Sequence, residues 1–441
     1  MIALVASITA LLLSTLVLMV GSGLLGTLLS VRLAAEAFPA DVTGAVMAAY
    51  FAGLMLGALG AGAVIRRAGH VRAFAVFAAV ATAAALVHGL YIDAWVWGGL
   101  RIVTGFSIAG LYMVIESWLN ERASSGNRGR LFSLYQIASY LGLGAGQFLL
   151  PLRPVEGTEL FMITAAILAL CLVPVSLTRA IHPTPPQRHR LALRAVFTSS
   201  RMGVLLCVAA GVVNGAAFAL APVFVVAFAG VQSVSVFMGA MILGGMLLQY
   251  PIGQLSDRFD RRLLIVVVNA ALLAVSGLLL AVTGAGLVLL AAVAALYGGL
   301  TFTLYPLAVA HINDRLGARG DVDFVGVAAA LLFLWGIGAA LGPVLVGGLM
   351  ARVGPEGLFL AVAGVTAAMA LYALIARGEQ VPAKEQSAFV SMARTTSVIS
   401  ELDPRAREID PQLDWIEELA RADASADEAT PSTQEASREA A

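Results

Sequence analysis

The chain has 441 residues, of which 60% are hydrophobic and only 12% are charged. That charged fraction is about half of the ~25% typical of soluble globular domains, too little to cover a water-exposed exterior. The mean hydropathy of +0.90 excludes disorder, collagen and coiled coil for most of the chain. Continuous apolar runs also argue against a transmembrane barrel, whose strands alternate polar and apolar residues. The composition therefore predicts an all-α membrane protein.

The formal net charge of zero conceals an asymmetry between the body of the chain and its end. Residues 1–376 hold 20 basic and 13 acidic side chains, whereas residues 377–441 hold 7 basic and 14 acidic ones. We therefore expect a membrane body with basic loops, followed by an acidic cytoplasmic tail that is largely disordered. Within the tail, Asp410-Pro411 is a typical helix start, which predicts a short amphipathic helix over 411–423.

Twelve apolar segments are long enough to cross a bilayer, which takes about 20 residues. We predict spans over residues 8–31, 42–65, 73–92, 96–118, 132–151, 159–178, 204–229, 233–254, 263–283, 287–310, 324–349 and 356–376. The run from 204 to 254 is twice as long as one span, so we divide it at Gly230-Val231-Gln232-Ser233.

The spans form two groups of six, which we interpret as an N-terminal bundle over 1–178 and a C-terminal bundle over 204–376. A proline- and arginine-containing segment over 179–203 is the expected cytoplasmic linker, and 377–441 is the tail. With the N-terminus in the cytoplasm, sixteen loop arginines fall on the cytoplasmic side and three on the other. The positive-inside rule then places both termini in the cytoplasm, with the protein in the bacterial inner (plasma) membrane.

An internal repeat supports two pseudo-symmetric bundles. Gly105, Tyr112 and the triplet Asn120-Glu121-Arg122 recur 193 residues later, in the tenth span and the loop that follows it. The later copies are Gly298, Tyr305, Asn313, Asp314 and Arg315. Repeated six-helix halves are typical of transporters, with the substrate site between the halves near the middle of the membrane.

The loop after the eighth span carries a glycine, an aspartate and several arginines. A glycine lets two helices pack closely, and an aspartate can meet a helix N-terminus or an arginine from the other half. We expect these residues to form a cytoplasmic gate: Gly253, Asp257, Arg258, Arg261 and Arg262. The first-half copy of this loop has Arg66 at the acidic position, so any such ionic gate is expected in the second half.

These features resemble the major facilitator superfamily. The loop over 253–262 resembles its motif A, and Arg101 with Gly105 resembles motif B. The glycine- and proline-rich run over 338–348 resembles motif C, although it lies in span eleven and not in span five. Other stretches resemble the YcaD-type branch: Glu116-Ser117, Asn127-Arg128-Gly129-Arg130-Leu131, Gln249-Tyr250-Pro251-Ile252-Gly253 and Thr301-Phe302-Thr303-Leu304-Tyr305-Pro306.

The resemblance implies a secondary transporter, working as a monomer, whose two bundles rock about a central site. We expect a small organic solute as substrate, a proton as a candidate coupling ion, and membrane lipid around the spans. An alternative is a transporter-derived sensor or scaffold that signals through its tail, with a tail-binding protein as partner. Deleting residues 380–441 and comparing transport with the cellular response distinguishes the two.

Polar residues within spans are the candidate site residues, because each is costly in lipid. Arg101 is a candidate for coupling or anion contact, and Glu116 for a proton-linked or gating role or an ion pair with a loop arginine. Asn214 is a candidate for substrate contact or for helix–helix hydrogen bonding. Four aromatic or hydroxyl residues of spans four and ten are candidates for lining the cavity or for packing: Tyr112, Tyr297, Thr301 and Tyr305. Lesser candidates are Tyr140, Gln147 and Gln249.

Signals for other functions are absent from the sequence. It has no Gly-x-Ser-x-Gly elbow and no phosphate-binding P-loop, so neither an enzyme nor an ATP-driven pump is expected. No histidine or cysteine cluster suits a metal, and no cofactor is expected. The basic loops are dispersed, which indicates membrane topology and not a nucleic-acid surface.

Overall fold

The computed structural model describes residues 2–123, 127–177, 191–317, 324–376, 389–390, 395–396 and 398. Over these residues the chain forms helices joined by short connections, without a strand. Within residues 1–403 the described part of the chain forms one compact unit. The tail helix predicted at 411–423 lies outside the described residues, as do residues 179–190 of the predicted linker.

The helices of the first half match the first six predicted spans. They are α1 (Ile2–Ala35), α2 (Ala40–Ala68), α3 (His70–Leu90), α4 (Ala94–Arg122), α5 (Arg128–Gln147), the 3-10 turn η1 (Leu150–Leu152), α6 (Glu159–Leu170) and α7 (Leu172–Ser176). The sixth predicted span is thus divided at Cys171. Pro174 explains the break, because it has no N–H to donate to the carbonyl of Leu170.

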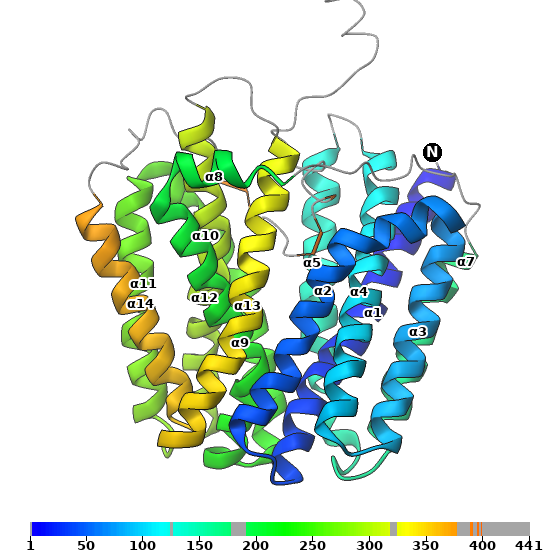
Figure 1. The fold of residues 1–441 in the computed structure, drawn as a ribbon, viewed down its shortest axis with the longest axis horizontal. Helices are drawn as coiled ribbons and strands as arrows, with labels where there is room; N and C mark the ends of the chain where they lie inside the picture. The colour runs from blue at the N-terminus through cyan, green and yellow to red at the C-terminus, as the bar shows by residue number, and fades with distance from the viewer. Residues whose placement is uncertain are drawn as a thin grey trace, which may run out of the picture. The chain divides into compact units, whose positions relative to one another are not determined.

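The second half begins inside the segment predicted as linker. Its helices are α8 (Leu193–Ser199), α9 (Arg201–Ala229), α10 (Val231–Arg258), α11 (Arg261–Ala281), α12 (Leu287–Gly317), α13 (Phe324–Val353) and α14 (Gly357–Ile375). The long apolar run is divided where the sequence predicted, at Gly230, whose φ of 78° ends α9 and permits a one-residue turn into α10. Figure 1 shows α1–α7 gathered to one side and α9–α14 to the other.

Eleven segments in the described part of the chain are long and apolar enough to cross a membrane. The fifth predicted span, α5, does not meet that criterion because polar residues interrupt it. The helices run between two ends of the molecule. We call the end that holds the α2–α3, α4–α5 and α10–α11 connections the arginine-rich end; it is the upper end in Figure 1.

Glycines set how closely the helices of one half pack. A Cβ atom built on Gly105 of α4 would lie 2.2 Å from the carbonyl oxygen of Tyr50 on α2, and one on Gly53 would lie 2.2 Å from that of Ile102. In the second half, a Cβ on Gly338 of the motif C run would lie 2.1 Å from the carbonyl oxygen of Val208 on α9. These backbones therefore touch directly, as small residues allow in membrane helices.

The two halves also meet through glycine, at the end opposite the arginine-rich end. A Cβ on Gly44, near the start of α2, would lie 2.1 Å from the carbonyl oxygen of Pro343 on α13. A Cβ on Gly347 would lie 2.5 Å from the carbonyl oxygen of Ala40. The halves also meet between α10 and the end of α5, where a Cβ on Gly239 would lie 2.9 Å from the ring of Phe148. The halves are therefore in tight contact at this end.

The close approach of α2 and α4 gives a first testable prediction. Gly105→Ala forces these helices apart, because its new Cβ would overlap the Tyr50 carbonyl, and we expect a loss of about 1–3 kcal/mol in the free energy of unfolding. Unfolding of the detergent-solubilised protein, monitored by heat or denaturant, measures it. The matched control is Gly26→Ala, whose Cβ meets nothing within 4 Å. Equal stability of the two variants would contradict the packing described.

Candidate functional site

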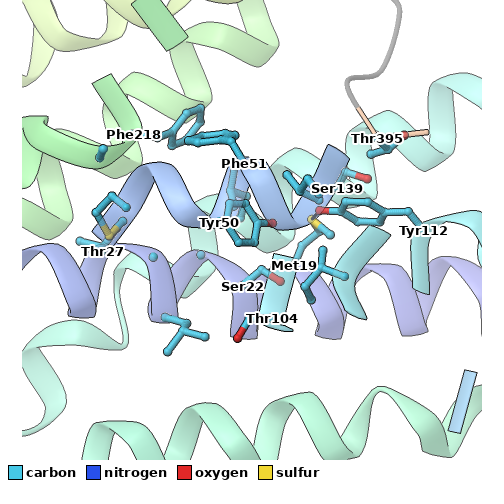
Figure 2. Close-up of a pocket in the computed structure, with 18 of the residues that line it drawn as sticks. Met19, Ser22, Thr27, Tyr50, Phe51, Thr104, Tyr112, Ser139, Phe218 and Thr395 are labelled. Carbon is cyan, nitrogen blue, oxygen red and sulfur yellow. Dashed lines mark hydrogen bonds between the residues drawn. The ribbon is translucent and has the colours of Figure 1, made fainter. Parts of the chain in front are cut away.

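A cavity of about 190 Å³ lies between the halves, mainly against α1, α2, α4 and α5. For comparison, an apolar cavity of about 150 Å³ engineered into a protein is large enough to bind benzene. Phe218 and Ala219 of α9 and Trp335 of α13 complete its wall from the second half. Figure 2 shows the lining side chains of α1, α2 and α4 with Thr395 at one side. A small organic molecule therefore fits between the halves.

Arg101 is the charged residue of this lining. Its side chain is 4% exposed, and its guanidinium lies over the ring of Tyr50, 4.2 Å from the ring centre. No carboxylate among the described residues pairs with Arg101, and its Nε has no hydrogen-bond partner there. The close contact between α2 and α4 at Gly105 brings the two side chains together. The cavity thus contains one buried positive charge, held against an aromatic face.

A polar stripe on α5 forms the opposite side of the cavity. Gln136, Ser139, Tyr140 and Gln147 line it, and their spacing of three, four and seven residues places them on one helix face. Gln147 accepts a hydrogen bond from Thr27 Oγ1 (2.6 Å), which ties α5 to α1. The sequence analysis named Tyr140 and Gln147 as lesser candidates but missed Gln136 and Ser139, and with them the stripe as a whole. Its helical spacing was the available signal, together with the low hydropathy of α5.

The remaining wall is apolar. Met19, Met47, Phe51, Phe218 and Trp335 line it, and the rings of Phe51 and Trp335 meet edge-to-face with centres 6.0 Å apart. Because Phe51 belongs to α2 and Trp335 to α13, this aromatic contact joins the halves. The cavity therefore combines one cation and a polar stripe with a large apolar surface.

Glu116 lies beyond the cavity, toward the arginine-rich end. It is fully buried, and it accepts hydrogen bonds from Tyr135 (2.8 Å) and from Thr395 and Thr396. Asn120, one turn further along α4, donates to the carbonyl oxygen of Val398 (2.9 Å). The described residues near the C-terminus thus bind to α4, and Thr395 itself lines the cavity.

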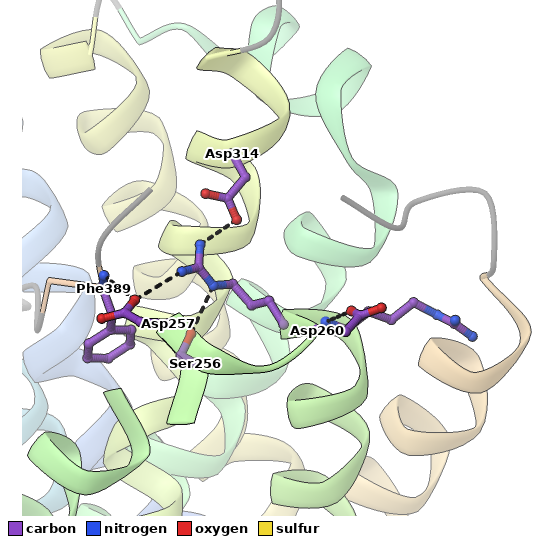
Figure 3. A network of polar contacts seen from close by, with 7 residues as sticks. Ser256, Asp257, Asp260, Asp314 and Phe389 are labelled. Carbon is purple, nitrogen blue, oxygen red and sulfur yellow. Dashed lines mark hydrogen bonds and ion pairs between the residues drawn. The ribbon is translucent and has the colours of Figure 1, made fainter. Parts of the chain in front are cut away.

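The motif A residues form a network around a buried ion pair (Figure 3). Arg261 pairs with Asp314 of α12, with side chains 1% and 0% exposed, and its Nε donates to Ser256 Oγ (2.9 Å). Asp257 lies 3.6 Å from Arg261 and accepts a hydrogen bond from the backbone N–H of Phe389 (2.7 Å). The aspartate of the motif therefore contacts its own half and the C-terminal residues, and not an arginine of the first half.

The other predicted gate residues serve different contacts. Arg262 donates to the carbonyl oxygens of Ala373 and Leu374 (both 2.6 Å), which caps the end of α14. Gly253 lies against the ring of Phe389, and Arg258 is exposed. Asp314 was noted only as part of the repeat in the sequence analysis. That repeat, which placed an acidic residue at 121 and 314, was the signal for the ion pair.

Several predicted site residues lie away from the cavity. Asn214 is fully buried and donates to the carbonyl oxygens of Ala210 (2.6 Å) and Thr301 (3.3 Å), so it joins α9 to α12. These bonds agree with the helix–helix alternative, and substrate contact by Asn214 stays a prediction. Tyr297 packs against Phe359, and Tyr305 packs against Trp335. These residues, including Thr301, do not line the cavity in this conformation, whereas Arg101 and Tyr112 do.

Comparisons with known proteins agree with this architecture. The family model for the Major Facilitator Superfamily matches residues 11–336. The MFS-type transporter YcaD of Salmonella enteritidis PT4 is 30% identical over 358 residues, which cover 80% of this chain and 91% of that protein. The corresponding protein of Salmonella arizonae is 29% identical with the same coverage. The resemblance to the YcaD-type branch is therefore confirmed.

Solved structures share the fold at low identity. The nucleoside transporter NupG superposes with a TM-score of 0.71 at 16% identity, over 83% of this chain and 98% of that chain. A bacterial homologue of the lysosomal transporter Spinster, in an inward-facing conformation, gives 0.59 at 14% identity, over 92% and 99%. Together with the eleven candidate spans, the family match shows an integral membrane protein.

The buried ion pair gives a second prediction. Asp314→Asn removes the close, buried partner of the Arg261 guanidinium and leaves Asp257, which lies 3.6 Å away and is 41% exposed, so we expect a loss of about 3–5 kcal/mol in the free energy of unfolding. The double variant Arg261→Met with Asp314→Leu removes both charges and is expected to recover most of that loss. Denaturant unfolding measures all three proteins. The control Arg258→Gln changes an exposed arginine and should cost less than about 1 kcal/mol; an Asp314→Asn cost as small as this would contradict the assignment.

The contacts of Glu116 give a third prediction. Thr395→Val with Thr396→Val removes two donors to a buried carboxylate, and we expect a loss of about 1–3 kcal/mol in unfolding free energy. Thr198→Val is the control, since this exposed threonine bonds to its own helix. Thermal unfolding in detergent measures the effect. If the unfolding midpoints of both variants shift by the same small amount, the C-terminal residues are not held by Glu116.

Proposed function

Because the chain belongs to the major facilitator superfamily, we propose that it is a secondary transporter that moves a small organic solute through the cavity between its halves. The observation that carries the proposal is a cavity walled by both halves, next to tight glycine contacts between α2 and α13 at the end opposite the arginine-rich end. Rocking the halves about this cavity would open the glycine contacts of α2 with α13 and close the arginine-rich end.

The fifth helix completes the proposed set of twelve spans in two bundles. Arg128–Gln147 is 20 residues long, enough to cross a hydrocarbon core of about 30 Å. Its low hydropathy comes from the polar stripe that faces the cavity, where lipid does not reach. Gly142 and Gly146 press its backbone against α1, where an added Cβ would lie 2.4 Å and 2.3 Å from carbonyl oxygens. A span that lines a water-filled cavity fits this composition.

The proposed orientation follows from charge. The positive-inside rule supports a cytoplasmic location for the arginine-rich end and for both termini. The bacterial relatives support the bacterial inner membrane as the proposed location. The structure would then be an inward-facing conformation, because its halves are in tight contact at the other end. A monomer contains both walls of the cavity, so the proposed mechanism needs one copy of the chain.

Glu116 is the proposed proton carrier, should solute movement be coupled to protons. It is a fully buried carboxylate on α4, four residues from the cavity-lining Tyr112, and hydroxyl groups bind both of its oxygens. Protonation would weaken those bonds to Thr395 and Thr396, which links the proton to the contacts at the arginine-rich end.

Cysteine accessibility tests the proposed mechanism without knowledge of the substrate. Gly26 lines the cavity and has open space at its Cβ position, so Gly26→Cys places a thiol there. In a Cys171→Ser background, a membrane-impermeant maleimide applied to oriented vesicles is expected to label this thiol from either side, because the cavity opens to each side in turn. The buried native Cys207 is the internal control and should react from neither side.

Labelling from one side only, under every condition tried, would contradict alternating access. It would favour the alternative in which the fold no longer moves solute and acts as a sensor or scaffold. Labelling of Cys207 by the maleimide would instead indicate that the variant is unfolded. A thermal unfolding curve of each variant shows whether it is folded.

A further inference from the structure

We infer that the solute of this transporter is a small organic anion with a single negative charge, whose carboxylate-like group binds Arg101. The inference deepens the proposed function and rests on it, because it identifies the solute class that the cavity would carry. Three observations lead to it: the unpaired charge, the geometry of the guanidinium, and the composition of the wall.

The first observation is the unpaired charge. Arg101 is 4% exposed, and in the described part of the chain no carboxylate forms a salt bridge with it. Two other buried arginines differ in this respect: Arg32 pairs with Glu36 (2.7 Å), and Arg261 pairs with Asp314. Ionised groups buried within membrane proteins pair with one another or mark a ligand pathway. At Arg101 no carboxylate of the described residues balances the positive charge, so a negatively charged ligand can do so.

The second observation is the geometry of the guanidinium. The guanidinium carbon of Arg101 lies over the ring of Tyr50, 4.2 Å from the ring centre. A guanidinium has five N–H donors in one plane, and those of Arg101 form no hydrogen bond with the described residues. The Nε has no partner among the described residues. Planar donors of this kind match the two oxygens of a carboxylate, which would bind in a bidentate manner.

A neighbouring hydroxyl supports the same ligand. Ser22 lines the cavity from α1, and its Oγ has no hydrogen-bond partner among the described residues. Figure 2 shows Ser22, Tyr50 and Thr104 facing the same space. The hydroxyl of Thr104 is already committed, since it donates to the carbonyl oxygen of Leu100 (2.7 Å). Ser22 is therefore free to donate a second hydrogen bond to an anionic group held by Arg101.

The third observation is the composition of the wall. Away from Arg101 and the polar stripe of α5, the wall includes Met19, Met47, Phe51, Phe218 and Trp335, which suit an apolar or aromatic body. One positive charge neutralises one negative charge, so a dianion would leave a charge uncompensated in a poorly solvated site, and a cation would be repelled. A volume of about 190 Å³ limits the body to about the size of a substituted benzene ring.

Binding of a matched series of probes to the purified full-length protein tests the inference. Benzoate, benzamide, benzylamine and phthalate share a ring and differ in charge. We expect benzoate to raise the thermal unfolding midpoint in a concentration-dependent way, and to bind at least tenfold more tightly than the other three by isothermal titration calorimetry. Arg101→Gln should lower benzoate affinity at least tenfold, and Arg101→Lys should lose less, because it retains the charge.

Arg32→Gln is the matched control, since it removes an equally buried but paired arginine and should leave benzoate affinity within about twofold. Preferential binding of the neutral or cationic probe, or benzoate binding that survives Arg101→Gln, would overturn the inference. Absence of binding by all four probes also overturns it for ring-sized anions. These outcomes are separate from failure of the proposed function, which is decided by two-sided labelling of Gly26→Cys.

Discussion

A single buried positive charge, Arg101, is the constraint on which this account of the protein depends. Membrane interiors tolerate such a group only when something compensates it, and here the guanidinium lies over the ring of Tyr50 and forms no hydrogen bond with the described residues. The contact exists because Gly53 and Gly105 let α2 and α4 touch along their backbones. A feature of the helix packing thus determines the electrostatics of the cavity.

The two ends of the molecule are built from different interactions. At the end opposite the arginine-rich end, the halves meet through glycine and backbone carbonyl groups, which form a close but chemically weak contact that rocking can break. At the arginine-rich end, charges and hydroxyl groups dominate: Arg261 with Asp314, and Glu116 with Thr395 and Thr396. Such contacts respond to protonation and to the presence of a solute, which suits a proposed gate.

The architecture could be predicted from sequence because hydropathy and glycine placement are local properties of the chain. Each of the twelve predicted segments overlaps a helix, and the division at Gly230 is confirmed by its positive φ. The site could be predicted only in part. Arg101 and Tyr112 line the cavity, but Asn214 bonds helix to helix, because which face of α9 points inward depends on the packing of distant helices. On α5, Tyr140 and Gln147 were only lesser candidates, and Gln136 and Ser139 were missed, because these residues form a site only when the helix packs beside α1.

Crystals of the protein grown with 4-bromobenzoate would test the central claim most directly, because bromine can be located by its anomalous scattering. The account predicts a bromine peak among the apolar residues Met19, Phe51 and Trp335, with the carboxylate within hydrogen-bond distance of the Arg101 guanidinium. A bromine peak outside the cavity, or a carboxylate directed away from Arg101, would contradict it.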